Sequence, residues 1–273
     1  MELAEARLGD ADNDTDLQAS ALLAVRGLTI RFGGVTALDD VSFEVPRGAI
    51  CGLIGPNGAG KTTLFNCISR LYDPHAGSIA FDGRPLASCA RHELASLGIA
   101  RTFQNVALFK GMTSLDNIMT GRNLRMKRNL FWQALRRGPA LDEEIANRRV
   151  CEEIIDFLEI EHIRKTPVGA LPYGLQKRVE LARALAMEPE LLLLDEPMAG
   201  MNREEKEDMS RFIVEANRYR GATIALIEHD IGVVMDLSDL VVVLDYGRKI
   251  ADDVPEKVKS DGKVIGAYLG VGY

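Results

Sequence analysis

The sequence predicts an α/β fold built on a parallel sheet, and two observations support this prediction. The stretch "GAICGLIG" has the composition of a buried strand that ends in a glycine-rich loop, and an amphipathic helix is expected directly after it, from about residue 61 to 70. Further along the chain, three apolar strands, "LLLL", "TIALI" and "LVVVL", each follow a stretch with helical character. Alternation of this kind places the strands parallel to one another, with helices packed on the sheet.

The N-terminal part of the chain has a different pattern, which predicts further strands joined by turns. "LLAVRGLTIRF" and "DDVSFEV" alternate in the manner of strands, and the Asp39–Asp40 pair suits a turn between them. "GSIAFDG" is expected to be a short strand that closes in an Asp-Gly turn. The stretch from about residue 115 to 161 is expected to be mainly helical. One face of a later helix is marked by Leu175, Val179, Ala182 and Leu185.

Length and composition limit the classes of protein that fit. Residues 1–20 are rich in acidic side chains and poor in bulky apolar ones, so we expect a disordered tail there and a single folded domain over residues 21–273. The net charge of −7 argues against a nucleic-acid partner, because such domains usually carry a basic face. The four cysteines form no C-x-x-C pair and predict neither a zinc site nor disulfides. Since no apolar run is long enough to span a bilayer, the chain is expected to be soluble and cytoplasmic unless another subunit holds it at a membrane.

The stretch "GPNGAGKT" matches the phosphate-loop pattern G-x-x-x-x-G-K-[ST]. Glycines let the backbone wrap closely around a triphosphate and aim its N–H groups at the phosphate oxygens, and the helix that follows adds its positive N-terminal end. Lys61 is expected to reach the β- and γ-phosphates, and the hydroxyl of Thr62 to bind Mg²⁺. The expected nucleotide contacts are Gly55, Pro56, Asn57, Gly58, Ala59, Gly60, Lys61, Thr62 and Thr63. The sequence therefore predicts a site for a nucleoside triphosphate and Mg²⁺, and the resemblance given below implies that the nucleotide is ATP.

Two carboxylates, Asp195 and Glu196, follow the buried strand "LLLL". Because side chains alternate along a strand, the two cannot both point at one metal ion, which indicates separate roles. Asp195 is expected to bind Mg²⁺, and Glu196 to polarise the water that attacks the γ-phosphate. His229 follows another buried strand and is expected at the same edge of the sheet, near the γ-phosphate or the attacking water. Gln104 also follows a short strand-like run, although local pattern explains it equally well as a polar loop residue.

Taken in order, these motifs resemble the nucleotide-binding subunit of ABC transporters. The resemblance runs from about residue 22 to the C-terminus, with the signature stretch at 171–176 and the D-loop at 199–202. It implies a P-loop ATPase core with an antiparallel β lobe and a helical subdomain inserted at about 105–170. It also implies that Gln104 contacts the metal and the reacting groups, and that Phe32 stacks on adenine. The resemblance further implies that two such domains form a dimer with two ATP molecules between them. Each phosphate loop then faces the other subunit's signature stretch, so Tyr173, Gly174 and Gln176 would contact the partner's ATP.

A narrower resemblance points to the ATP-binding subunits of branched-chain amino acid importers. It is carried by "RFGGVTALDDVSFEV", "RTFQN", "LPYGLQKRVELARAL", "DEPMAGMN", "LIEHD" and "VIGAYLG". The partners it implies are two transmembrane permeases, a second ABC ATPase and, indirectly, an extracytoplasmic solute-binding protein, with the chain peripheral at the cytoplasmic face of the membrane. Importers of urea, amides or aromatic acids share much of this pattern. An exporter ATPase, a soluble ABC ATPase acting on DNA or ribosomes, and a non-hydrolysing scaffold are further alternatives.

Two features depart from the common family pattern or add to it. Pro172 stands where the usual signature has a serine, and it offers neither a hydroxyl nor a backbone N–H to a phosphate. The resulting hypothesis is an asymmetric heterodimer with an ATPase whose signature is intact. The stretch at 122–137 is basic and contains Trp132, so it either contacts lipid headgroups or permease loops, or is a solvated helix face.

Overall fold

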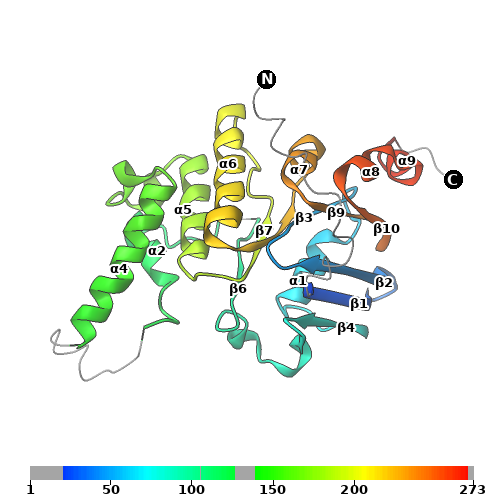
Figure 1. Ribbon diagram of the computed structural model, residues 1–273, viewed down its shortest axis with the longest axis horizontal. Helices are drawn as coiled ribbons and strands as arrows, with labels where there is room; N and C mark the ends of the chain where they lie inside the picture. Colours follow the sequence, from blue (N-terminus) through cyan, green and yellow to red (C-terminus); the bar gives the residue numbers. More distant parts are fainter. Residues whose placement is uncertain (1–20, 105, 127–138, 270–273) are drawn as a thin grey trace, which may run out of the picture.

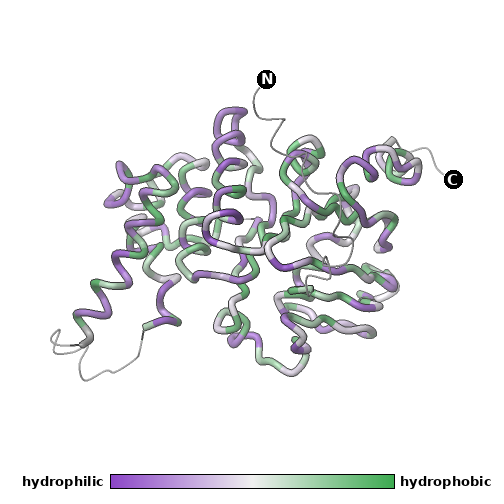
Figure 2. Tube along the Cα trace, viewed as in Figure 1, coloured by the Kyte–Doolittle hydropathy of each residue, from purple (hydrophilic) through white to green (hydrophobic). Residues whose placement is uncertain are grey.

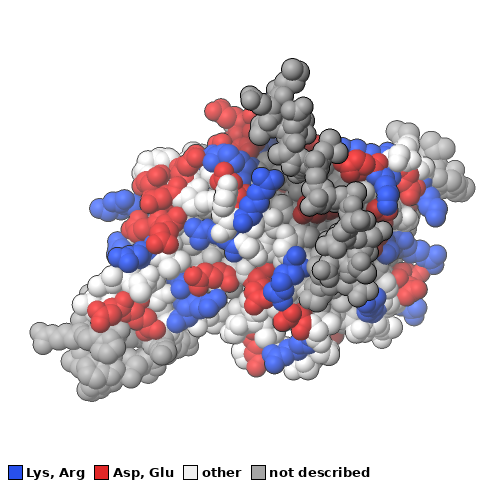
Figure 3. Space-filling model, in the orientation of Figure 1, with Lys and Arg blue, Asp and Glu red and all other residues white. Residues whose placement is uncertain are grey.

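The computed structural model of the protein describes residues 21–104, 106–126 and 139–269. The expected disordered tail at 1–20 lies outside these residues, as does most of the basic stretch at 122–137. None of the helices within the described ranges combines the length and the apolar character needed to cross a membrane. Acidic and basic side chains are intermixed on the face shown in Figure 3, so the negative net charge is not gathered in one patch there.

A six-stranded sheet with the order β10-β9-β3-β8-β7-β6 forms the core. The strands from β9 to β6 pair in parallel, and β10 pairs antiparallel with β9. The strands are β3 (Ile50–Ile54), β6 (Ile99–Arg101), β7 (Leu191–Asp195), β8 (Thr223–Ile227), β9 (Leu240–Asp245) and β10 (Arg248–Asp253). Every residue of β3, β7 and β8 is buried, which explains their uninterrupted apolar sequences. The predicted α/β fold with a parallel core is confirmed.

Both faces of this sheet are covered by hydrophobic clusters. Leu192 and Leu194 of β7 belong to a cluster formed largely by helices, whereas Leu191 and Leu193 belong to a second cluster formed with the N-terminal strands. In Figure 2 the central strands accordingly appear hydrophobic, while the upper part of α6 (Arg203–Arg220) is hydrophilic. The sheet therefore lies between a helical layer and a β lobe.

The β lobe is a four-stranded antiparallel sheet with the order β2-β1-β4-β5. Its strands are β1 (Ala21–Phe32), β2 (Val35–Pro46), β4 (Ala76–Phe81) and β5 (Arg84–Pro85). The expected Asp-Gly turn joins β4 to β5, with Asp82 and Gly83 both in the left-handed region. The expected turn at Asp39–Asp40 is wrong, because the chain reverses at Gly33–Gly34 and both aspartates lie within β2. Asp40 has a φ of 53° beside a shift in strand register, so it forms a bulge instead.

Helices occur along the whole length of the molecule, including its middle, where α6 lies (Figure 1). The α-helices are α1 (Lys61–Ile68), α2 (Ser114–Thr120), α4 (Pro139–Phe157), α5 (Tyr173–Leu185), α6, α7 (Ile231–Leu237), α8 (Pro255–Ser260) and α9 (Gly262–Leu269). Short 3₁₀ helices occupy Leu86–Ser88, Arg91–Glu93, Glu161–Ile163 and Val168–Ala170. The helices expected within 105–170, α2 and α4, lie together away from the β lobe, and α5 packs against both.

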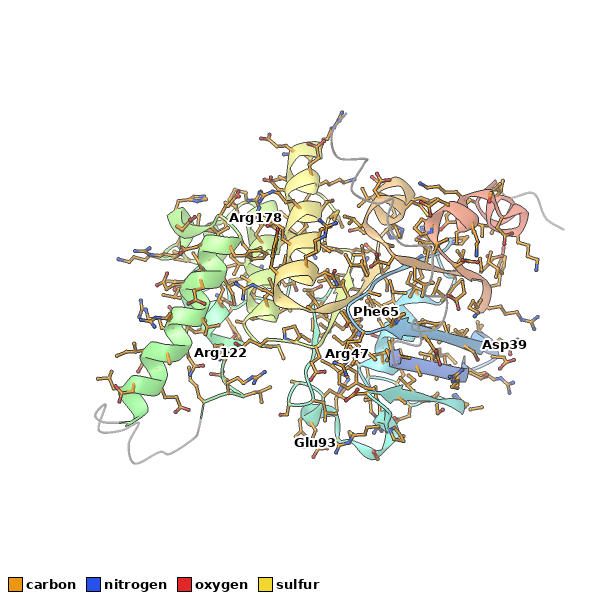
Figure 4. All side chains as sticks on the ribbon, viewed as in Figure 1. Asp39, Arg47, Phe65, Glu93, Arg122 and Arg178 are labelled. Carbon is orange, nitrogen blue, oxygen red and sulfur yellow. The ribbon has the colours of Figure 1, made fainter. Side chains whose placement is uncertain are left out.

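Arg122 shows that the basic stretch is not uniformly a surface feature. Its side chain is buried; its Nε donates to Oδ1 of Asn147 at 2.8 Å, and its Nη1 donates to the carbonyl of Ala186 at 2.8 Å. Nη1 also lies 2.9 Å from a carboxylate oxygen of Glu188. Figure 4 shows Arg122 between the helical group and the sheet. Arg122 therefore joins the chain that follows α2 to α4 and to the end of α5, and its buried side chain neither contacts lipid nor belongs to a solvated face.

Candidate nucleotide site

The phosphate loop occupies the chain between β3 and α1, and its backbone conformation requires glycine at two positions. Gly55 has a φ of 150°, and a Cβ atom there would lie 2.1 Å from the carbonyl oxygen of Leu244 in β9. Gly60 has a φ of 104°, and its Cβ atom would lie 2.6 Å from the carbonyl oxygen of Ala37 in β2. Since L-residues rarely adopt such φ values and real Cβ atoms do not approach so closely, both glycines are dictated by packing. The loop is held between the two sheets.

Lys61, the first residue of α1, turns its side chain back into this loop. Its Nζ donates to the carbonyls of Gly55 at 2.6 Å and Pro56 at 3.1 Å, and the residue is buried. Burial lowers the pKa of the Lys61 ammonium, while the negative charges of Glu196 and Asp195 oppose the shift. The loop thus surrounds a cationic side chain that faces the two carboxylates, which is a suitable setting for an anionic ligand.

Glu196 lies between two polar side chains that come from neighbouring strands. Its Oε1 is 2.8 Å from Nε2 of His229, and its Oε2 accepts a hydrogen bond of 3.0 Å from Nε2 of Gln104. Gln104, Glu196 and His229 follow β6, β7 and β8, so the parallel sheet brings all three to its carboxyl edge. Glu196 is almost fully buried and has a φ of 51°, an uncommon conformation that aims the carboxylate at this meeting point.

The carboxylate of Asp195 binds different side chains from those that bind Glu196. Its Oδ2 is 2.8 Å from Nη2 of Arg101, which also donates from Nη1 to Oδ1 of Asn66 at 2.9 Å and to the hydroxyl of Ser69 at 3.0 Å. The other oxygen, Oδ1, is buried and has no hydrogen-bond partner within the described part of the chain. A buried, unpartnered carboxylate oxygen is costly unless a ligand satisfies it, and an oxygen donor of this kind suits Mg²⁺.

A cavity of about 400 Å³ opens over the phosphate loop. It is lined by Ala37, Asn57, Gly58, Ala59, Gly60, Lys61, Thr62, Thr63, Gln104, Glu196 and His229. The lining combines the backbone of the loop with the side chains of Lys61, Thr62 and Glu196, so an ammonium, a hydroxyl and a carboxylate border one hollow. Gly55, Pro56 and Asp195 are not part of this lining.

Phe32 lies outside this lining, near the end of β1. It is exposed and packs edge-on against Tyr72, with ring centroids 5.0 Å apart and an interplanar angle of 68°. Tyr72 was not predicted from the sequence, because it follows α1 and reaches Phe32 only through the fold. The two rings offer an aromatic surface large enough for a base.

The signature residues do not reach the cavity within this chain. Tyr173, Gly174 and Gln176 lie in the first turn of α5, and Pro172 precedes them as the residue that caps the helix. Nε2 of Gln176 donates to the carbonyl of Leu171 at 2.8 Å, whereas Pro172 and Tyr173 are exposed. None of these residues belongs to the lining of the phosphate-loop cavity.

Glu228 is a buried carboxylate that the sequence analysis did not single out. Its Oε1 accepts a hydrogen bond of 2.7 Å from the backbone N–H of Met198, and its Oε2 accepts one of 3.2 Å from the N–H of His229. It joins the loop that follows Glu196 to the end of β8. Neighbouring positions in "LIEHD" gave no signal for this role, because the partner is 30 residues away in the chain.

We expect Glu228→Gln to change the pH dependence of stability. Burial raises the pKa of the Glu228 carboxyl above its ordinary value of 4.5, although two backbone N–H bonds oppose the rise. The protonated carboxyl contributes its full stability at a pH below the pKa that it has in the unfolded chain. This contribution is lost as pH rises through the higher pKa of the folded protein. Because glutamine does not titrate, the free energy of unfolding of the variant relative to wild type should increase from pH 4.5 upward, by about 1.4 kcal/mol per unit of pKa difference. Urea unfolding across pH 4.5–8 measures this, and a constant or falling difference would contradict it.

Comparisons with a family model, with curated proteins and with solved structures all find ATP-binding proteins of ABC transporters. The family model described as "ABC transporter" matches residues 38–199. The chain is 39% identical over 252 residues to the high-affinity branched-chain amino acid transport ATP-binding protein BraF of Pseudomonas aeruginosa, covering 91% of this chain and 98% of that protein. It is also 39% identical over 257 residues to LivG of Escherichia coli, a protein of the same description, with the same coverage. Among solved structures, the ADP conformation of MJ1267, an ATP-binding cassette of an ABC transporter, superimposes with a TM-score of 0.79 at 31% identity over 92% of this chain and 99% of that one.

Proposed function

The chain belongs to the ABC transporter family, and on this basis we propose that it is the ATP-hydrolysing, energy-coupling subunit of an importer for branched-chain amino acids. The observation that carries the hydrolytic part is the position of Glu196, held between Gln104 and His229 at the edge of the phosphate-loop cavity. The solute class is supported by the names of BraF and LivG, whose length this chain matches almost completely.

In the proposed mechanism, the phosphate chain of ATP lies along the backbone N–H groups of the loop. Lys61, whose ammonium now bonds to the carbonyls of Gly55 and Pro56, turns to the β- and γ-phosphates when they arrive. Glu196 accepts a proton from the attacking water, and Gln104 and His229 hold its carboxylate toward that water. His229 is half-exposed at the cavity wall, so it can also contact the γ-phosphate.

Mg²⁺ fits the oxygen donors that remain at this edge. When bound, the ion neutralises charge that develops on the β- and γ-phosphates. Thr62 would hold it through its hydroxyl, Asp195 through the unpartnered Oδ1, and Gln104 through its amide oxygen. Arg101 fixes the other oxygen of Asp195 and thereby leaves one face of the carboxylate for the metal.

Adenine is proposed to stack on Phe32, with Tyr72 supporting the ring from the side. We expect Phe32→Ala to weaken ATP binding by about 1–3 kcal/mol, the usual loss when an aromatic platform for a base is removed. Turnover at saturating ATP should change little, because the ring is remote from the γ-phosphate. Titration with a fluorescent ATP analogue measures the affinity; Tyr219→Ala, which removes an exposed aromatic side chain on α6, is the matched control. Equal affinity of wild type and Phe32→Ala would contradict the assignment.

Dimerisation is proposed to bring a partner's ATP to the N-terminus of α5, where Tyr173, Gly174 and Gln176 lie. Because Pro172 has neither a hydroxyl nor a backbone N–H to donate to the phosphate, that composite site loses about 1.5–3 kcal/mol relative to one with a serine. We therefore propose a heterodimer with an ATPase that has an intact signature, in which the ATP on this chain's phosphate loop turns over faster. Inactivating the catalytic glutamate of each subunit separately tests this, and equal hydrolysis at the two sites would contradict it.

The complex is proposed to include two permease subunits and to place this chain at the cytoplasmic face of the membrane, with a solute-binding protein on the opposite side. Affinity capture of Glu196→Gln with ATP from gently solubilised cells, followed by mass spectrometry, tests the assembly. Two permeases and a second ATPase are the expected partners. Ribosomal or DNA-repair proteins in their place would overturn the transport assignment.

A further inference from the structure

Two charged side chains one turn apart on α5 are almost completely buried. The side chains of Lys177 and Glu180 are each 1% exposed, and Nζ of Lys177 lies 3.4 Å from Oε2 of Glu180. The same helix is otherwise apolar toward the core, through residues such as Val179 and Leu181. Burying such a pair carries a desolvation cost, and apolar side chains of similar size commonly give equal or greater stability. The reason for these charges must therefore be sought in the groups that they bind.

Both charges bind the backbone of the segment that follows β6. Nζ of Lys177 donates to the carbonyls of Phe103 at 3.2 Å and Gln104 at 3.1 Å. Oε1 of Glu180 accepts from the N–H of Phe103 at 3.3 Å and, more weakly, from the N–H of Ala107 at 3.5 Å. Both backbone groups of Phe103 are thus bound by the Lys177–Glu180 pair.

The same segment carries the side chain that reaches the base. Gln104 donates from Nε2 to Oε2 of Glu196, and its own carbonyl is held by Lys177. β6 ends at Arg101 and α2 begins at Ser114, so regular secondary structure does not fix the backbone at Gln104. The buried pair therefore binds the backbone that carries the Gln104 side chain.

We propose that Lys177 and Glu180 are positioning residues for ATP hydrolysis: they fix the backbone at Phe103 and Gln104 so that the Gln104 amide holds the Glu196 carboxylate in its reactive orientation. The inference rests on the proposed roles of Gln104 and Glu196. It also makes the geometry around Glu196 depend on the placement of α5, the helix whose first turn is proposed to meet the partner's ATP. Neither residue contacts the nucleotide cavity.

The decisive variant is Lys177→Met/Glu180→Met, which keeps unbranched side chains of similar length but removes all contacts to the segment. We expect kcat for ATP to fall about tenfold and KM to stay within twofold, because the phosphate loop is untouched. In a Gln104→Ala background the same double substitution should change kcat by less than twofold, since the group that it positions is already gone. A merely structural role would lower activity equally in both backgrounds.

Arg178→Met is the matched control, because Arg178 is adjacent on α5 and pairs instead with Asp208 of α6 at 2.5 Å (Figure 4). Hydrogen exchange gives a second readout: the Phe103 amide should exchange about tenfold faster in the double variant and unchanged in Arg178→Met. If the double variant fails to fold, Glu180→Gln is judged by the same comparison of backgrounds.

The possible results separate the two proposals. Full turnover by both Glu196→Gln and Gln104→Ala would overturn the proposed catalytic site. Loss of turnover in those two variants, combined with normal kcat and Phe103 exchange in the double variant, would overturn the positioning role alone. An equal loss of kcat with and without Gln104 would also overturn it.

Discussion

Glu196→Gln is expected to lower ATP turnover by at least about 100-fold while ATP binding is retained, because a positioned general base contributes 10²–10⁴-fold. Glutamine has nearly the same shape and can still meet His229 and Gln104, whose side chains lie 2.8 and 3.0 Å from the carboxylate oxygens. It cannot accept the proton of the attacking water. Release of inorganic phosphate measures turnover, and calorimetric titration measures binding of Mg-ATP.

The matched control for this prediction is Glu207→Gln, an exposed carboxylate on α6 that pairs with Arg203. Its turnover should equal that of wild type. A loss of less than threefold in Glu196→Gln would show that another group acts as the base. A parallel loss of ATP binding would show instead that the substitution disturbs the loop.

Gly55→Ala is expected to remove ATP binding and to destabilise the protein by about 3 kcal/mol. The new methyl group would meet the carbonyl oxygen of Leu244 at 2.1 Å, at a φ of 150° that alanine rarely adopts, and strain of this kind costs about 1–3 kcal/mol before the clash is added. To relieve the clash, the loop must move away from β9, and its N–H groups then no longer converge on the phosphates. Denaturant unfolding and ATP titration measure the two effects.

Gly58→Ala introduces backbone strain into the same loop without a steric clash. Gly58 has a φ of 82°, but a Cβ atom there would meet nothing within 4 Å. We therefore expect it to lose only about 1 kcal/mol of stability, from backbone strain alone. Equal losses in the two variants would show that the contact with Leu244 does not fix the loop.

The fold could be predicted from the sequence where a local pattern determines the structure. The apolar runs at β3, β7, β8 and β9 indicated buried parallel strands, and the Asp82–Gly83 turn followed from its dipeptide. The Asp39–Asp40 turn was misplaced because aspartate pairs suit both turns and bulges. The pairing of β2 with β1 decided between them, and sequence pattern does not reveal that register.

The candidate site was predictable only for residues that belong to sequence motifs. The structure places loop residues 57–63, Gln104, Glu196 and His229 around one cavity, whereas Gly55 and Pro56 lie outside its lining. The chemical roles of all these residues stay predictions. Arg101 and Lys177 could not be predicted from local sequence, because their partners are 94 and 73 positions away in the chain. A buried arginine or lysine looks like any surface charge until the fold supplies its partner.

Solute uptake by the purified complex tests most directly whether this chain couples ATP hydrolysis to amino acid import. The complex captured through this chain would be reconstituted into proteoliposomes with the solute-binding protein, ATP on the side of the ATPases and radiolabelled leucine on the other. We predict ATP-dependent leucine uptake with wild type and none with Glu196→Gln at equal assembly. Uptake that persists in the Glu196→Gln complex, or ATP hydrolysis with no leucine uptake in wild type, would contradict the account.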